Sequence, residues 1–158
     1  MPGAQMPATP EEFVASLHIE RDTMRSFVSL LESEQNSLLA GETEQLLALA
    51  ESKTRTANRL HELGSSRRQF QAAHSFSDNM ENWLKSHASK ELPVWSEIRK
   101  LADRAQQLNH TNGEMIRVKL RHNQQALNVL HNAAQNASLY GPDGQPNLPG
   151  MGRKLGSV

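Results

Sequence analysis

The longest helical pattern of the chain begins at Pro93 and continues to Gly141, with the sequence PVWSEIRKLADRAQQLNHTNGEMIRVKLRHNQQALNVLHNAAQNASLYG. Its mostly apolar stripe recurs at steps of three and four, with one step of seven, which is the spacing of one face of an α-helix. Since Pro favours the first turn of a helix and Gly follows the last, we expect one helix about 70 Å long. The stripe consists of Ile98, Leu101, Ala105, Leu108, Asn112, Met115, Lys119, Ala126, Leu130, Ala133, Ala137 and Tyr140.

Two shorter helices precede this long one. The run Thr9-Pro10-Glu11-Glu12 has an N-cap residue, Pro at the first helical position and a Glu three residues after the cap, which are start signals of a helix. A stripe from Phe13 to Leu39 follows, so we expect a helix over residues 10–40 that ends at Gly41. A second stripe begins after Thr43 and weakens at residues 64–66. The short connection predicts that the second helix returns antiparallel to the first.

Residues 67–92 have a less regular pattern, which predicts a ragged continuation of the second helix and one short helix. Within this segment and just after it, Trp83 and Trp95 are expected to be core anchors. The sequence therefore predicts an all-α fold, an antiparallel up-down bundle of three long helices with a short helical connecting segment and a long C-terminal helix. We expect a disordered leader over residues 1–8, the bundle over 9–141 and a flexible Gly/Pro-rich tail over 142–158.

Composition excludes several classes of protein. The 158 residues fit one domain, and the absence of Cys excludes disulfides and thiolate chemistry. Basic and acidic residues number 17 each, but residues 1–50 carry eight acidic and two basic side chains. Complementary charges between neighbouring helices are the expected reason, with no nucleic-acid partner. Without a signal peptide or a long apolar run, we expect a cytoplasmic protein with no stable membrane insertion.

The seven histidines do not indicate a metal centre. None has a second His three or four residues later, and none has Glu three residues before it, so helical spacing offers no metal site. No phosphate-cradling Gly-rich loop or nucleophile elbow is present. We expect no enzyme, no cofactor and no catalytic residue; a phosphorelay or metal-binding bundle is the rival hypothesis.

The lengths of the helices predict an uncovered surface. The first helix offers the last one only about 31 residues of partner, so we expect the two to part near residue 123. Beyond that point an apolar face continues, which predicts a groove for a partner helix unless the connecting segment or a second copy covers it. The same helix holds eleven side-chain amides within residues 106–136. So many amides favour either a helix face that a partner covers reversibly or a face that is simply exposed to solvent. Polar seam positions include Asn112, Lys119, His122 and Asn123.

Two sets of residues match the pattern of a known family. The first set is Leu30, Leu31, Glu34, Leu38, Leu39, Leu46, Leu49, Lys53, Leu60, Leu63 and Arg67. The second set is Leu108, Asn109, Asn112, Gly113, Ile116, Leu120, Gln125, Ala126, Leu127, Leu130, Leu139, Tyr140, Gly141 and Gly144. With these residues the sequence resembles the FlgN-type flagellar export chaperones over about residues 25–145.

This resemblance implies a chaperone of bacterial flagellum biogenesis that binds the hook-filament junction proteins FlgK and FlgL. Such a chaperone prevents their premature assembly and delivers them to the type III export gate, where it is transiently located. The substrate-binding residues implied here are Ala126, Leu127, Leu130, Ala133, Ala134 and Ala137. A tyrosine near the end of the helix docks to the gate protein FlhA in that family, and it corresponds to Tyr140.

The alternative is a self-associating coiled-coil adaptor without secretion cargo, in which the exposed face of the long helix forms a homodimer. Both hypotheses depend on the same apolar face. They differ in whether a second copy or a different polypeptide covers it. If the face binds cargo, we expect Leu127 and Leu130 to be its anchors, at about 1 kcal/mol or more each when truncated to Ala.

Overall fold

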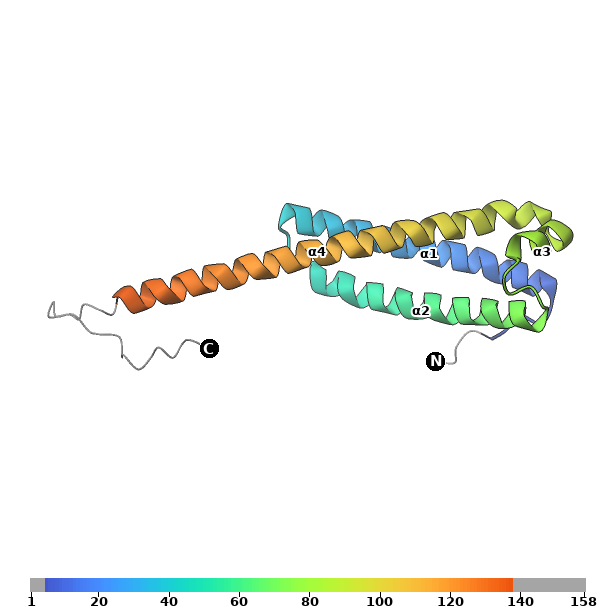
Figure 1. Cartoon of the computed structure of the whole chain (residues 1–158), viewed down its shortest axis with the longest axis horizontal. Helices are drawn as coiled ribbons and strands as arrows, with labels where there is room; N and C mark the ends of the chain where they lie inside the picture. Colours follow the sequence, from blue (N-terminus) through green and yellow to red (C-terminus); the bar gives the residue numbers. More distant parts are fainter. Residues whose placement is uncertain (1–4, 138–158) are drawn as a thin grey trace. The chain divides into compact units, whose positions relative to one another are not determined.

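The computed structural model describes residues 5–137, and side chains over residues 5–133 (Figure 1). Within this range the chain is all-α, as the sequence predicts. The predicted tail (142–158), residues 1–4 of the predicted leader and the last residues of the predicted long helix lie outside the described residues. The elements are α1 (Pro10–Ala40), α2 (Leu46–Ala73), α3 (Met80–His87), the 3₁₀ helix η1 (Ser89–Glu91) and α4 (Leu92–Ala137).

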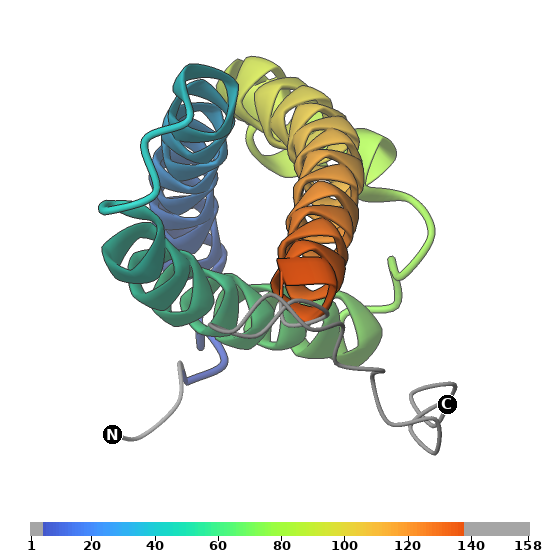
Figure 2. The same ribbon diagram turned by 90° about the vertical axis from the view of Figure 1, so that its left-hand side faces the viewer.

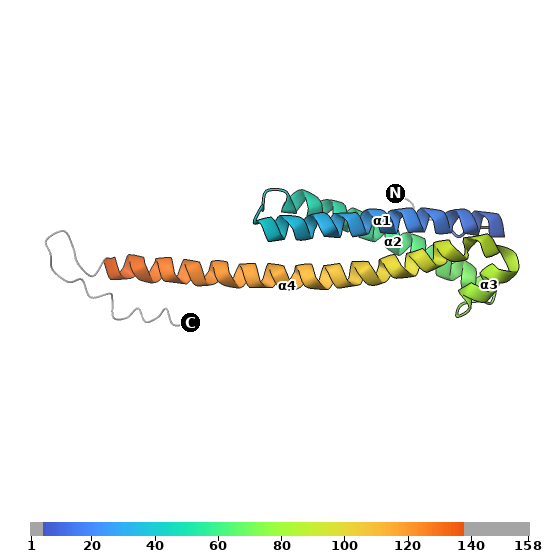
Figure 3. The same cartoon turned by 90° about the horizontal axis from the view of Figure 1, so that it is seen from above.

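The chain divides into two compact units. The first unit is Met1–Gly113 and the second is Glu114–Val158, so α4 contributes residues to both. Within the first unit, α1 and α2 lie side by side and run in opposite directions (Figures 1 and 3). Seen along the helices, α1, α2 and the yellow first part of α4 are three separate rods (Figure 2). The predicted antiparallel hairpin is confirmed.

The two ends of α1 are fixed by the residues that the sequence indicates. At its start, the Glu12 N–H donates to Thr9 Oγ1 at 3.1 Å, and the Glu12 carboxylate accepts from the Ala8 N–H at 2.7 Å. At its end, Gly41 adopts a left-handed conformation with φ of 73°. The Gly41 N–H donates to the Leu38 carbonyl and the Glu42 N–H to the Ser37 carbonyl, which closes the helix in a Schellman motif.

Helix α2 continues past the expected weak point at residues 64–66 and ends at Ala73. The predicted continuation of the second helix and the short helix after it are thus confirmed. The weak stretch stays helical because its small residues are packing positions: Gly64 and Ser66 are buried, and so are Leu63 and Phe70 on either side of them. Burial of a continuous helix face outweighs the low helix propensity of Gly and Ser.

An aromatic cluster closes one end of the first unit, where α3 lies next to the start of α1 and the end of α2 (Figure 3). Phe13 stacks on Phe70 with ring centroids 4.3 Å apart, and Phe76 stacks on Trp83 at 4.7 Å. The expected core role of Trp83 is thus confirmed. Residues of α1, α2, α4 and the segment between α2 and α4 meet in this cluster. This connecting segment therefore belongs to the core of the first unit.

A second cluster joins α1 to α4. It consists of Val28, Leu31, Ala105 and Leu108, with Met24, Phe27 and Leu101 packed against it. The buried positions of α4 end at Asn112, earlier than the separation near residue 123 expected from helix lengths. That expectation took the first turns of α1 and α4 to lie side by side. The register of the two helices is instead set by the side-chain contacts between them.

The glycine at the end of α1 gives the first prediction. In Gly41→Ala, the added methyl group meets no neighbour within 4 Å, but the φ of +73° remains. We expect the free energy of unfolding, measured in urea, to fall by about 1 kcal/mol because an L-residue is strained in this region.

Gly113→Ala is the matched control, since an added Cβ there also meets nothing within 4 Å and the position is helical. It should raise the free energy of unfolding by about 0.5–1 kcal/mol. Equal effects of the two substitutions would contradict the assignment of Gly41 as the cap.

Candidate functional site

A buried carboxylate connects the three long helices of the first unit. Glu34 on α1 is 4% exposed, and its two oxygens accept from Lys53 Nζ on α2 at 3.0 and 3.2 Å. From α4, Asn112 Nδ2 donates to Glu34 Oε1 and to the Leu31 carbonyl, both at 2.9 Å. Asn112 Oδ1 is buried with no hydrogen-bond partner in the described part of the chain. Polar core groups of this kind set helix register, since other registers leave the carboxylate unpaired.

A second buried ion pair lies nearer the aromatic cluster. Arg67 on α2 donates through Nε to both oxygens of Glu20 on α1, at 3.0 and 3.1 Å, and through Nη1 to Gln71. The guanidinium also lies 5.1 Å from the centre of the Trp95 ring on α4. Trp95 is half-buried and packs against the aromatic cluster, so the expected core role is met only in part. Burial raises the pKa of Glu20, although the positive charge of Arg67 and its hydrogen bond oppose this shift.

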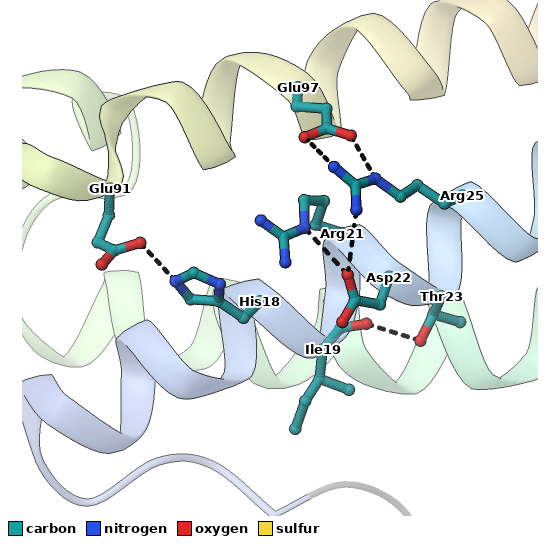
Figure 4. Close-up of polar contacts among 8 residues, drawn as sticks. All are labelled: His18, Ile19, Arg21, Asp22, Thr23, Arg25, Glu91 and Glu97. Atoms are coloured by element: carbon teal, nitrogen blue, oxygen red, sulfur yellow. Dashed lines mark hydrogen bonds and ion pairs between the residues drawn. The ribbon is translucent and has the colours of Figure 1, made fainter.

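Exposed polar contacts join α1 to the segment that begins α4 (Figure 4). Arg25 donates to both oxygens of Glu97, and His18 contacts Glu91. The hydrogen bond from Arg25 lowers the pKa of the Glu97 carboxyl. Acidic residues of the first 50 positions pair with basic residues further along the chain at Glu20–Arg67, Glu34–Lys53 and Glu32–Arg104. The predicted internal charge complementarity is confirmed.

Glu20 gives a prediction on pH. A carboxyl group whose pKa is raised on folding stabilises the fold fully below its unfolded pKa, near 4.5, and this stabilisation is lost as the pH rises through the folded pKa. Going from pH 7 toward pH 4.5, the wild type should therefore gain stability relative to Glu20→Gln, which has no such titration. Chemical denaturation at both pH values measures the difference, and a change of the opposite sign would contradict burial as the dominant cause.

The network around Glu34 gives a prediction on ion pairing. Lys53→Met removes the cation and leaves the carboxylate with Asn112 as its remaining partner, so the free energy of unfolding should fall by about 2 kcal/mol. The double variant Glu34→Gln, Lys53→Met removes both charges and should recover most of this loss. Denaturant titration of both variants measures it; an equal loss in the two would show that the buried charge is not the cause.

The candidate binding residues belong to the second unit. Leu127 is 60% exposed and Leu130 is 66% exposed, and Ala126 and Ala133 are exposed as well. Ala134 and Ala137 lie within α4 but their side chains are not described, and Tyr140 lies outside the described residues. From Glu114 to Ala133, every side chain is exposed except Met115 and Lys119, which are half-buried; Gly113 precedes this stretch.

The exposed apolar residues form one stripe along α4. At 100° per residue, Ile116, Leu120, Asn123, Leu127 and Leu130 all lie within about 40° of Ile116 around the helix axis. We call these five residues the α4 stripe. Ala126 and Ala133 adjoin it on one side, so the four described residues of the predicted site share this face. The spacing of four and three is that of a coiled-coil seam, which pairs with another helix.

Two residues of this stripe, Ile116 and Leu120, were not predicted from the sequence to be site residues. Ile116 is 36% exposed and Leu120 is 62% exposed. Their signal was present in the alternating steps of four and three, but the predicted seam passed through Met115 and Lys119 instead. His122 and Asn123, expected on a seam that alternates between cover and exposure, are exposed.

The described residues give no indication of a metal site or of a membrane-spanning helix. Over the described range, no group of three or more His, Asp or Glu side chains is placed to hold a metal ion. No helix among these residues is long and apolar enough to cross a membrane.

Comparison with known proteins decides the family. A family model described as "FlgN protein" matches residues 6–147. The chain belongs to the FlgN family. No curated protein and no solved structure matches it.

Membership in the FlgN family confirms the resemblance seen in the sequence. The family is one of chaperones for flagellar export, and it is not a family of enzymes. The match covers both the buried network and the α4 stripe.

Proposed function

We propose that this protein is a cytoplasmic chaperone that binds the C-terminal amphipathic segments of FlgK and FlgL and prevents their premature assembly. It then delivers them to the export gate protein FlhA. The observation that carries the proposal is the exposed α4 stripe in a chain of the FlgN family. An apolar stripe at coiled-coil spacing fits the apolar face of an amphipathic helix.

The composition of the face suits reversible binding. Ile116, three leucines and neighbouring alanines offer modest apolar area, worth roughly 25 cal/mol per Å² when covered. Amide side chains such as Asn123, Gln124 and Asn128 are exposed in the free chain and are readily rehydrated when cargo leaves. A chaperone that must release its cargo without a chemical step needs this balance of moderate affinity and easy release.

Further proposed residues extend the site toward the C-terminus. Ala134 and Ala137 continue the substrate-binding stretch, and Tyr140 docks to FlhA. In this proposal, cargo binding and gate docking use adjacent parts of one segment.

The proposal predicts a loss of cargo affinity when the anchors are truncated. Each of Leu127→Ala and Leu130→Ala should cost about 1 kcal/mol or more, so the double variant should bind a C-terminal FlgK fragment about 30-fold more weakly or worse. Titration calorimetry with the full chain measures this, with circular dichroism as a check of helicity.

Val118→Ala is the matched control, because Val118 is also an exposed apolar residue of α4, 44% exposed, but lies on the far side of the helix from the stripe. It should bind the fragment like the wild type. Unchanged affinity in the double variant would remove the proposal. A stable dimer in light scattering that hides the stripe would favour the self-associating adaptor.

A further inference from the structure

The charges near the α4 stripe have one sign. From Met115 to Ala137 the chain contains no Asp or Glu, and its basic residues are Arg117, Lys119 and Arg121. The first unit, by contrast, pairs many of its acids with bases. The basic side chains in this stretch of α4 therefore have no acidic side chain within the same stretch with which to pair.

Two of these cations flank the stripe and the third does not. At 100° per residue, Arg117 lies on one side of the stripe and Lys119 on the other, both near its N-terminal end, whereas Arg121 lies on the polar face. Further along, one flank carries Gln124 and His131 and the other carries Ala126 and Ala133. In a coiled coil these flanks face the flanks of the partner helix.

The existing contacts of the two flanking cations are weak. Arg117 pairs with Glu114 on the same helix, where both side chains are more than half exposed, so the pair contributes little to stability. Lys119 is half-buried and makes no ion pair with any described residue. Both cations are thus free to pair with a partner that carries acids at the corresponding positions.

We infer that the occupant of the α4 stripe is an amphipathic helix with Asp or Glu flanking its apolar seam at one end, the end that meets Arg117 and Lys119. At the other end its flanking residues are neutral and small enough to pack against Ala126 and Ala133. The inference rests on the proposed function and adds the charge pattern of the bound segment and the placement of its acidic end at Arg117 and Lys119.

A second copy of this chain is a poorer occupant. The exposed part of α4 offers no carboxylate after Glu114, so a paired copy of the same stretch supplies no acid for either cation, whichever way it runs. Such a dimer would also place a polar Asn123 in each seam. Self-association through this face therefore lacks the charge pairs that fix partner and orientation.

Two synthetic helical peptides test the inference against the full chain. Both carry the same leucine seam over four heptads and have Ala at the flanking positions of one end; at the flanking positions of the other end, one peptide has Glu and the other has Lys. Fluorescence anisotropy should show the Glu peptide binding about tenfold more tightly at low salt, with the preference shrinking as ionic strength rises. In Arg117→Glu, Lys119→Glu the order should reverse, while Arg121→Glu, which adds the same charge off the flanks, should keep it.

The outcomes separate this inference from the proposed function. Equal affinity for the two peptides, or an unchanged order in the double charge variant, overturns the acidic partner. If the FlgK fragment still depends on Leu127 and Leu130 in that case, the proposed function stands without it. If neither peptide binds, or if sedimentation shows a tight dimer that Leu127→Ala dissociates, the inference is wrong.

Discussion

The structure depends on one buried carboxylate that needs partners from two other helices. Glu34 is almost fully buried, and an ionised carboxylate in such a place is costly unless it is paired and hydrogen-bonded. Lys53 supplies the charge and Asn112 a further hydrogen bond. Sliding any helix by one turn would break this arrangement. The network therefore fixes which residue of α4 is the last to be buried in the first unit.

The two parts of α4 differ because of where that network lies. Before Gly113, the apolar residues of α4 are packed, as at Ile98 and Leu108. After it, apolar residues of similar size are exposed, as at Leu120 and Leu127. The sequence keeps amides and cations among the exposed leucines, which limits the contiguous apolar area. One helix thus combines a structural half and a half available for binding.

Much of the fold could be predicted because helix ends are encoded locally. Thr9 and Gly41 fix the ends of α1 through contacts within a few residues, and both were read correctly from the sequence. The weak stripe at residues 64–66 is a different case, since Gly64 and Ser66 stay regularly helical through burial that only the packed structure provides. The register of α4 against α1 also depends on contacts between residues far apart in the sequence. Helix lengths alone therefore did not show that the buried positions of α4 end at Asn112. For the same reason Ile116 and Leu120 were assigned to no site.

We propose above that the exposed part of α4 binds export cargo. Hydrogen exchange of the full chain, followed by mass spectrometry with and without a C-terminal FlgK fragment, tests it most directly. The account predicts that cargo slows exchange in peptides from Glu114 onward along α4 and leaves those of α1 and α2 unchanged. Protection confined to the first unit, or none anywhere, would contradict it.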